Sequence, residues 1–264
     1  MKIIMELLLL ALGFGMLVKG ADWFVEGSSG IADRFGVPQL VIGLTIVAMG
    51  TSAPEAAVSI TAALKGNAEI TIGNIVGSNI LNILIILGIT SVIVTLAVAK
   101  STVRIEIPYM IFITAVLLLA GFSGSVVSRG EGALLWILFL IYLAYLLYMA
   151  MSGRQDNVDA QELQPLWKLF AGAVIGLVLV VAGSDVTVDA ATAIAKIIGM
   201  SERFIGLTIV ALGTSLPELF TSVSAALKGK ADIAIGNIVG SNIFNILFVA
   251  VSYTHLTLPT NSLV

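Results

Sequence analysis

The chain has 264 residues, of which 58% are hydrophobic and 11% are charged, and its mean hydropathy is +1.08. Soluble domains carry about 25% charged residues, so this composition excludes a water-soluble protein. The net charge of −3 without a basic run excludes a nucleic-acid partner, and the lack of cysteine, with His255 as the single histidine, leaves oxygen atoms to hold any bound metal ion.

Hydropathy predicts eight membrane helices, because a span needs about 20 predominantly apolar residues. We place them at residues 4–32, 37–64, 70–97, 104–121, 131–151, 166–197, 202–227 and 233–251. A polar linker, 152–165, separates a first half of five spans (1–151) from a second half of three spans (166–251). The tail 252–264 is too short and too polar to cross a bilayer.

The two halves contain a repeat. Residues 36–84 align with 199–247 without a gap, and 33 of the 49 positions are identical. The identities gather at Gly, Asn, Ser, Thr, Pro and Glu, whereas a duplication kept for packing alone would preserve apolar bulk. Equivalent positions are five spans apart, which inverts the second copy in the membrane. We therefore predict an all-α integral membrane protein with inverted repeats and broken helices at the midplane, which is typical of secondary transporters.

The motif Gly-Thr-Ser-x-Pro-Glu ends at Glu55 in the second span and at Glu218 in the seventh. Its proline has no N–H, so it frees the carbonyls of Gly50 and Gly213 and opens the helix. A charged side chain at mid-membrane costs roughly 2.5 to 3.5 kcal/mol, and freed carbonyls persist only where protein, water or an ion satisfies them. The motif pair therefore predicts a cation site. Two protonated structural acids, or a proton relay, remain alternatives.

A second motif, Gly-Asn-Ile-Val-Gly-Ser-Asn-Ile-x-Asn, occurs in the third and eighth spans. Ser78 and Asn82 are four residues apart and share a helix face, as do Ser241 and Asn245. Each pair offers a hydroxyl and an amide oxygen. Calcium accepts six to eight oxygen ligands in irregular geometry, so this inventory favours calcium over magnesium. The same oxygens are also suited to sodium.

These doubled motifs resemble the two alpha-repeats of the sodium/calcium exchanger family of cation/calcium antiporters, and the resemblance extends to about Val251. It implies ten spans in two inverted five-helix halves, of which about eight are present here, with the chain truncated after the eighth and followed by a non-family tail. It also implies exchange of calcium for sodium by alternating access, with the long first and sixth helices sliding against the rest. The ion ligands implied in this way are Glu55, Glu218, Thr51 and Thr214 for calcium, and the same glutamates with Ser52, Ser215, Ser78, Ser241 and the carbonyls of Ala48 and Ala211 for sodium. Asn82 and Asn245 stand where some members carry aspartate, which leaves two formal charges in the central site.

Other functions remain open from the residues alone. A calcium/proton or other cation antiporter is the alternative within the family, a cation channel is an alternative of another class, and an intramembrane hydrolase would use the two glutamates as acid and base. The expected partners are the lipid bilayer and the transported calcium and sodium ions, with no enzymatic activity, cofactor or protein partner implied. Short loops without targeting signals fit the plasma membrane of a prokaryote.

Charged residues outside the motifs have simpler interpretations. Asp22 and Glu26 near the end of the first helix recur, 163 residues later, as Asp185 and Asp189. We expect all four acids to face water at a membrane surface or an access passage. The Lys-Gly pairs that start at residues 65 and 228 are typical of helix C-termini.

Overall fold

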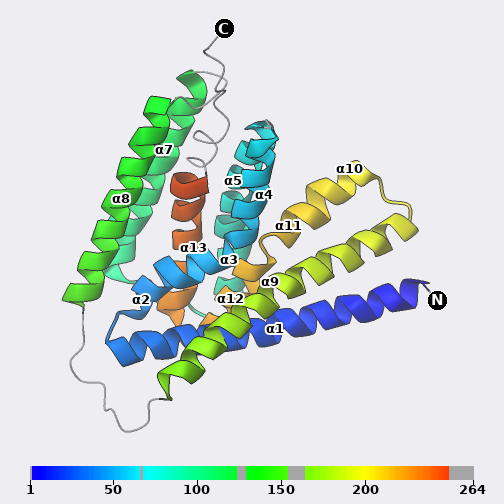
Figure 1. The fold of residues 1–264 in the computed structure, drawn as a ribbon, viewed down its shortest axis with the longest axis horizontal. Helices are drawn as coiled ribbons and strands as arrows, with labels where there is room; N and C mark the ends of the chain where they lie inside the picture. Colours follow the sequence, from blue (N-terminus) through cyan, green and yellow to red (C-terminus); the bar gives the residue numbers. More distant parts are fainter. Residues whose placement is uncertain (1, 66–67, 124–128, 154–163, 250–264) are drawn as a thin grey trace.

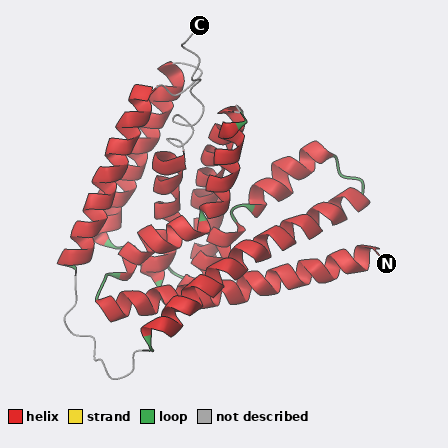
Figure 2. Ribbon diagram, in the orientation of Figure 1, coloured by secondary structure: helices red, strands yellow, loops and turns green. Residues whose placement is uncertain are grey.

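A computed structural model describes residues 2–65, 68–123, 129–153 and 164–249. These residues form helices with short connections and no strand (Figure 2). The all-α prediction is therefore confirmed. The predicted tail and most of the predicted polar linker lie outside the described residues.

The helices follow one another as α1 Lys2–Phe35, α2 Gln39–Ile42, α3 Ala48–Thr51, α4 Ala53–Leu64, α5 Ala68–Leu81, α6 Leu87–Ile93, α7 Ile107–Ser123, α8 Arg129–Ser152, α9 Leu166–Ile197, α10 Glu202–Ile205, α11 Ala211–Gly213, α12 Leu216–Leu227 and α13 Ala231–Phe244. Wider, π-helical turns continue several of them: η1 Gly43–Val47, η2 Asn82–Ile86, η3 Thr102–Glu106, η4 Gly206–Val210 and η5 Asn245–Val249. Such π segments occur frequently at functional sites.

Six helices in the described part of the chain are long and apolar enough to cross a membrane. The second predicted span forms a bent pair, Gln39–Thr51 and Ala53–Leu64, with an angle of 50°. The seventh predicted span is divided in the same place, and its second part is the shorter apolar helix Leu216–Leu227. In the described residues, six of the eight predicted segments are thus long apolar helices, and the bent pair makes a seventh. The remaining segment is broken, and its apolar helix is shorter.

The helices α1 and α9 lie side by side and run across the ends of the more upright helices, among them the pairs α4–α5 and α7–α8 (Figure 1). Glycines bring the two backbones into contact. A Cβ on Gly13 would lie 3.1 Å from the carbonyl oxygen of Gly183, and a Cβ on Gly20 would lie 2.8 Å from that of Gly176. Each contact is the other's equivalent at the repeat spacing, so the crossing follows the two-fold symmetry of the inverted repeat.

The helix α13 is the centre of the molecule. Every residue from Ile233 to Phe244 is buried, and α13 packs against α12, α7, α2, α3 and η1. Its polar motif therefore faces protein on all sides, which is the environment that polar groups at membrane depth require.

Candidate functional site

The site begins at the two helix breaks. Ser52 (φ −81°, ψ 5°) separates α3 from α4, and Ser215 (φ −94°, ψ 3°) separates α11 from α12. In each copy, proline follows within the first turn of the new helix, where its missing N–H costs no hydrogen bond. Glu55 and Glu218 also lie in these first turns. The predicted opening of both helices at the proline motif is confirmed.

The breaks are joined across the repeat. Ser52 Oγ donates a 2.8 Å hydrogen bond to Oε1 of Glu218, and Ser215 Oγ donates one of 3.3 Å to Oε1 of Glu55. The carboxylates are 2% and 1% exposed. The serine of each copy thus holds the glutamate of the other, and the two acids share one buried site.

The first asparagine of the second motif fastens the neighbouring helix to each break. Asn74 Nδ2 donates to the carbonyl of Glu55 at 3.1 Å and to Ser59 Oγ at 2.9 Å. Asn237 Nδ2 makes the equivalent bonds to the carbonyl of Glu218, at 3.3 Å, and to Ser222 Oγ, at 3.0 Å. These amides fix the glutamate backbones relative to α5 and α13.

A second pair of amides links the copies farther along α5 and α13. Asn82 Nδ2 donates to Oδ1 of Asn242 at 2.9 Å, and Asn245 Nδ2 donates to Oδ1 of Asn79 at 3.3 Å. Asn79 and Asn242 were not predicted as site residues. Their exact recurrence at the repeat spacing was the available signal, and their role as supports for the last asparagine of each motif follows only from the packing of α5 against α13.

Four oxygens of this arrangement are left open. Oε2 of Glu55, Oε2 of Glu218, Oδ1 of Asn82 and Oδ1 of Asn245 are buried and have no hydrogen-bond partner among the described residues. A buried acceptor without a partner costs about 1 to 3 kcal/mol, and here the four form two symmetry-related pairs. Two carboxylate and two amide oxygens form a donor set suited to a hard cation.

Neutral oxygens lie beside the first helix break. No group of three or more His, Cys, Asp or Glu side chains comes together in the part of the chain that the structure describes. The carbonyl of Ala48 accepts hydrogen bonds from Thr51 Oγ1 at 3.3 Å and Ser241 Oγ at 3.4 Å. Thr51 Oγ1 also lies 3.0 Å from Oδ1 of Asn237. Ser78 is buried on α5.

The proline motif that ends at Glu218 is less enclosed than the one that ends at Glu55. Thr51 and Ala48 are fully buried, whereas Thr214 is half-buried and Ala211 is exposed. The carbonyl that Pro217 frees, that of Gly213, accepts a 2.6 Å hydrogen bond from Ser184 on α9. Ten of the twelve predicted residues are therefore buried, whereas Thr214 is half-buried and Ala211 is exposed. Hydrogen bonds join Ser52 to Glu218, Ser215 to Glu55 and Ser241 to Ala48, while Asn82 and Asn245 bond to Asn242 and Asn79.

Known proteins share these features. The family model described as sodium/calcium exchanger protein matches residues 5–148 and 168–257. The protein CaxA of Alkalimonas amylolytica is 44% identical over 246 residues, which are 90% of this chain and 76% of the relative. The inner membrane protein YrbG of Escherichia coli K12 is 36% identical over 256 residues, covering 91% of this chain and 77% of the relative.

The fold is also similar to solved structures. A structure of the sodium-calcium exchanger NCX_Mj, soaked with sodium and no calcium, superimposes with a TM-score of 0.83 at 35% identity and covers 97% of this chain and 85% of its own. Together with the inverted repeats, the two proline breaks and the shared glutamate site, these similarities show that the chain is a multi-pass membrane protein that belongs to the sodium/calcium exchanger family.

Proposed function

We propose that this protein exchanges calcium for sodium across the plasma membrane of a prokaryote. The observation that carries the proposal is the set of four open oxygens, two from Glu55 and Glu218 at the helix breaks and two from Asn82 and Asn245, all of them buried. The two carboxylates would neutralise one calcium ion. The name of the E. coli relative, an inner membrane protein, supports the location.

The ligand shell is completed by oxygens that already line the site. Calcium takes six to eight oxygens at about 2.3 to 2.6 Å. Ser52 and Ser215 point their hydroxyls at the carboxylates, and Thr51 lies beside the same break. With the four open oxygens and Thr214 at the edge of the site, these hydroxyls supply enough donors for calcium.

Sodium would use an overlapping set of ligands. Ser78, Ser241 and the carbonyls of Ala48 and Ala211 offer neutral oxygens near the shared carboxylates, and the bond from Ser241 to Ala48 already joins α13 to the first break. Because both ions need the two carboxylates, binding of one excludes the other. This competition is the basis of coupled exchange rather than independent permeation.

The arrangement of the long helices supports alternating access. Helices α1 and α9 contact each other closely through glycines and cross the core as a pair. Movement of this pair relative to α4–α5 and α12–α13 would expose the shared site to one side of the membrane and then to the other. Inverted repeats provide two such conformations of similar energy.

The test is ion flux in liposomes that contain the purified protein. Calcium uptake that appears when sodium is loaded inside, and disappears when sodium is equal on both sides, supports the exchanger. Uptake driven equally by a proton gradient without sodium would indicate a calcium/proton antiporter. Calcium conductance without any opposing ion flux would indicate a channel, and either result would overturn the proposal.

A further inference from the structure

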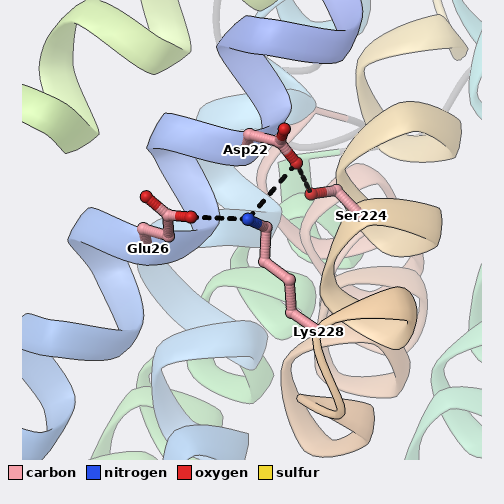
Figure 3. A network of polar contacts seen from close by, with 4 residues as sticks. All are labelled: Asp22, Glu26, Ser224 and Lys228. Atoms are coloured by element: carbon pink, nitrogen blue, oxygen red, sulfur yellow. Dashed lines mark hydrogen bonds and ion pairs between the residues drawn. The ribbon is translucent and has the colours of Figure 1, made fainter.

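Outside the ion site, a charged cluster joins α1 to the end of α12 (Figure 3). Lys228 Nζ lies 2.6 Å from Oε1 of Glu26 and 3.4 Å from Oδ1 of Asp22. Ser224 Oγ donates a 2.7 Å hydrogen bond to the same Asp22 oxygen. We expected both acids to face water at a membrane surface or an access passage; Glu26 is exposed and Asp22 is half-buried, and one lysine bridges them. We call these four residues the Lys228 cluster.

The lysine of this cluster is charged at neutral pH. Burial lowers the pKa of Lys228, but the hydrogen bond to Glu26 and the negative charges of Asp22 and Glu26 outweigh burial and raise the pKa above its ordinary value of 10.5. The attraction is therefore present at neutral pH, and on the alkaline side it is lost only as the pH rises through the raised pKa of Lys228.

The repeat places an equivalent set of residues elsewhere. At the spacing of 163, Asp22 and Glu26 correspond to Asp185 and Asp189 on α9, and Ser224 and Lys228 correspond to Thr61 and Lys65 at the end of α4. We call this set, Thr61, Lys65, Asp185 and Asp189, the Lys65 cluster. It retains a hydroxyl, a lysine and two acids in the same order along the helices.

The Lys65 cluster is open in this structure. Within the described residues Lys65 makes no ion pair with either aspartate, and Lys65, Asp185 and Asp189 are all exposed. A cavity of about 650 Å³ lies between α4 and α9 instead, lined by Asp185, Asp189, Ala57 and Val58. On the equivalent side, α1 packs along α12.

The cavity leads toward the ion site. Its lining includes Pro54, the neighbour of Glu55, and Thr214, the neighbour of Ser215. An open Lys65 cluster therefore coincides with access to the region of the helix breaks. The closed Lys228 cluster also borders a cavity, of about 490 Å³, but the lining of that cavity reaches neither helix break. Because the repeats are inverted, the two clusters lie on opposite sides of the membrane.

We propose that the Lys228 and Lys65 clusters are two symmetry-related latches that close in alternation, one in each access state. The structure holds the state in which the Lys228 latch is closed and the Lys65 latch is open. When α1 and α9 shift, Lys228 leaves its two acids and Lys65 gains the two aspartates, with Thr61 donating to Asp185 as Ser224 does to Asp22. This inference rests on the proposed exchange by alternating access.

Disulfide trapping tests the latches directly, since the chain has no cysteine of its own. One variant carries Asp22→Cys with Ser224→Cys, and the other carries Thr61→Cys with Asp185→Cys. We expect each pair to cross-link under a mild oxidant, each cross-link to arrest sodium-dependent calcium flux in liposomes, and a reductant to restore it. Single-cysteine variants, treated in the same way, are the controls.

The outcomes separate the two proposals. If the unsubstituted protein shows no sodium-dependent calcium flux, the proposed function fails, whatever the cross-links show. If flux is normal but the pair at positions 61 and 185 never cross-links, or cross-links without affecting flux, the alternating latch is overturned while the exchanger remains.

A second measurement avoids double substitutions at the latch. Ala57→Cys places a thiol in the lining of the open cavity, where its labelling by a water-soluble maleimide reports the population of this state. A partly exposed ion pair biases such an equilibrium by about two- to fivefold, so adding Lys228→Met should reduce the labelling rate by that factor. Adding Lys196→Met, which breaks the exposed pair to Glu202 between α9 and α10, should leave labelling unchanged. Equal labelling in both backgrounds would overturn the proposal.

Discussion

The helices α5 and α13 carry the same motif in two different environments. Val76 and Ile80 of α5 are 40% and 51% exposed, while their equivalents Val239 and Ile243 are 6% and 0% exposed. The glycines differ in the same way. A Cβ on Gly240 would lie 2.8 Å from backbone atoms of Leu44, whereas a Cβ on Gly77 would meet nothing within 4 Å. Identical sequence therefore specifies the polar face of the helix but not which neighbours cover the other faces.

The two helices have different neighbours. α7 and α8 form one core with α13 and η5, and the half-spans that precede the breaks also pack differently. In the first copy, α2, η1 and α3 pack along α13. In the second copy, α10 and η4 extend away from the core beside α9 (Figure 1). The more enclosed Thr51 and the less enclosed Thr214 reflect this contrast directly. Within the described residues, the asymmetry therefore follows from the neighbours that cover each copy of the motif.

The largest effect is expected at Glu55 and Glu218, where the two copies of the motif are equivalent. Glu55→Gln and Glu218→Gln should each reduce sodium-dependent calcium uptake by about 100-fold or more, because the bound calcium loses one of its two carboxylates and breaking a buried pair of opposite charges costs about 3 to 5 kcal/mol. Vesicle uptake of radioactive calcium measures this, with the exposed Glu202→Gln as control. Normal uptake by either variant would contradict the shared site.

The next prediction tests the packing difference between the two motif copies. Gly240→Ala should lower the free energy of unfolding by about 1 to 3 kcal/mol, because the new methyl group collides with backbone atoms of η1. Gly77→Ala should be neutral or stabilise by up to about 1 kcal/mol, since alanine favours the helix and the space is open. Thermal unfolding in detergent compares the variants, and equal destabilisation by both would show that α5 is covered like α13.

A smaller difference is expected for the asparagines that fasten the glutamate backbones. Asn237 is fully buried and bonded to three groups, including Thr51 across the repeat, whereas Asn74 is half-buried and bonded within its own copy. Asn237→Ala should therefore destabilise by about 2 to 3 kcal/mol and Asn74→Ala by about 1 kcal/mol. Thermal unfolding in detergent compares the two variants. A larger destabilisation by Asn74→Ala than by Asn237→Ala would contradict the difference in packing between the two copies.

The smallest effect concerns Ser184, which exists in only one copy. Its hydroxyl satisfies the carbonyl of Gly213, and the equivalent position in the first copy is Ala21. Ser184→Ala should cost about 1 kcal/mol of stability, while Ala21→Ser should give no comparable gain because Ala21 is fully buried in the α1 contact. If Ser184→Ala reduced sodium-dependent calcium flux strongly while the free energy of unfolding changed by only about 1 kcal/mol, the carbonyl of Gly213 would also serve the ion site.

Much of the fold and site followed from local chemistry in the sequence. The predicted limits of the long sixth segment, 166–197, match α9, because apolar composition and length govern spans. The breaks at Ser52 and Ser215 followed from proline, and the pairing of Glu55 with Glu218 followed from the inverted repeat. These are properties that a short stretch of chain, or its internal symmetry, determines.

Other features depend on packing that the repeat conceals. The cross-copy bonds of Asn79 and Asn242 require α5 and α13 to meet at one register. The bridging of Asp22 and Glu26 by Lys228 joins residues about 200 positions apart, while the equivalent residues of the other copy remain separate. The repeat predicts the same ion pairs for the Lys228 and Lys65 clusters, so the difference between them is visible only in the structure.

The burial of α13 also has a consequence for biogenesis. Its polar side chains find their partners in the first repeat, as the bonds of Asn237 to Thr51, Ser241 to Ala48 and Asn242 to Asn82 show. A helix that leaves the translocon before those partners are in place would carry several unsatisfied amides into lipid. Because the first repeat is synthesised earlier, its residues are in place when α13 inserts, and we expect defects in these contacts to be seen first as failed membrane integration and proteolysis.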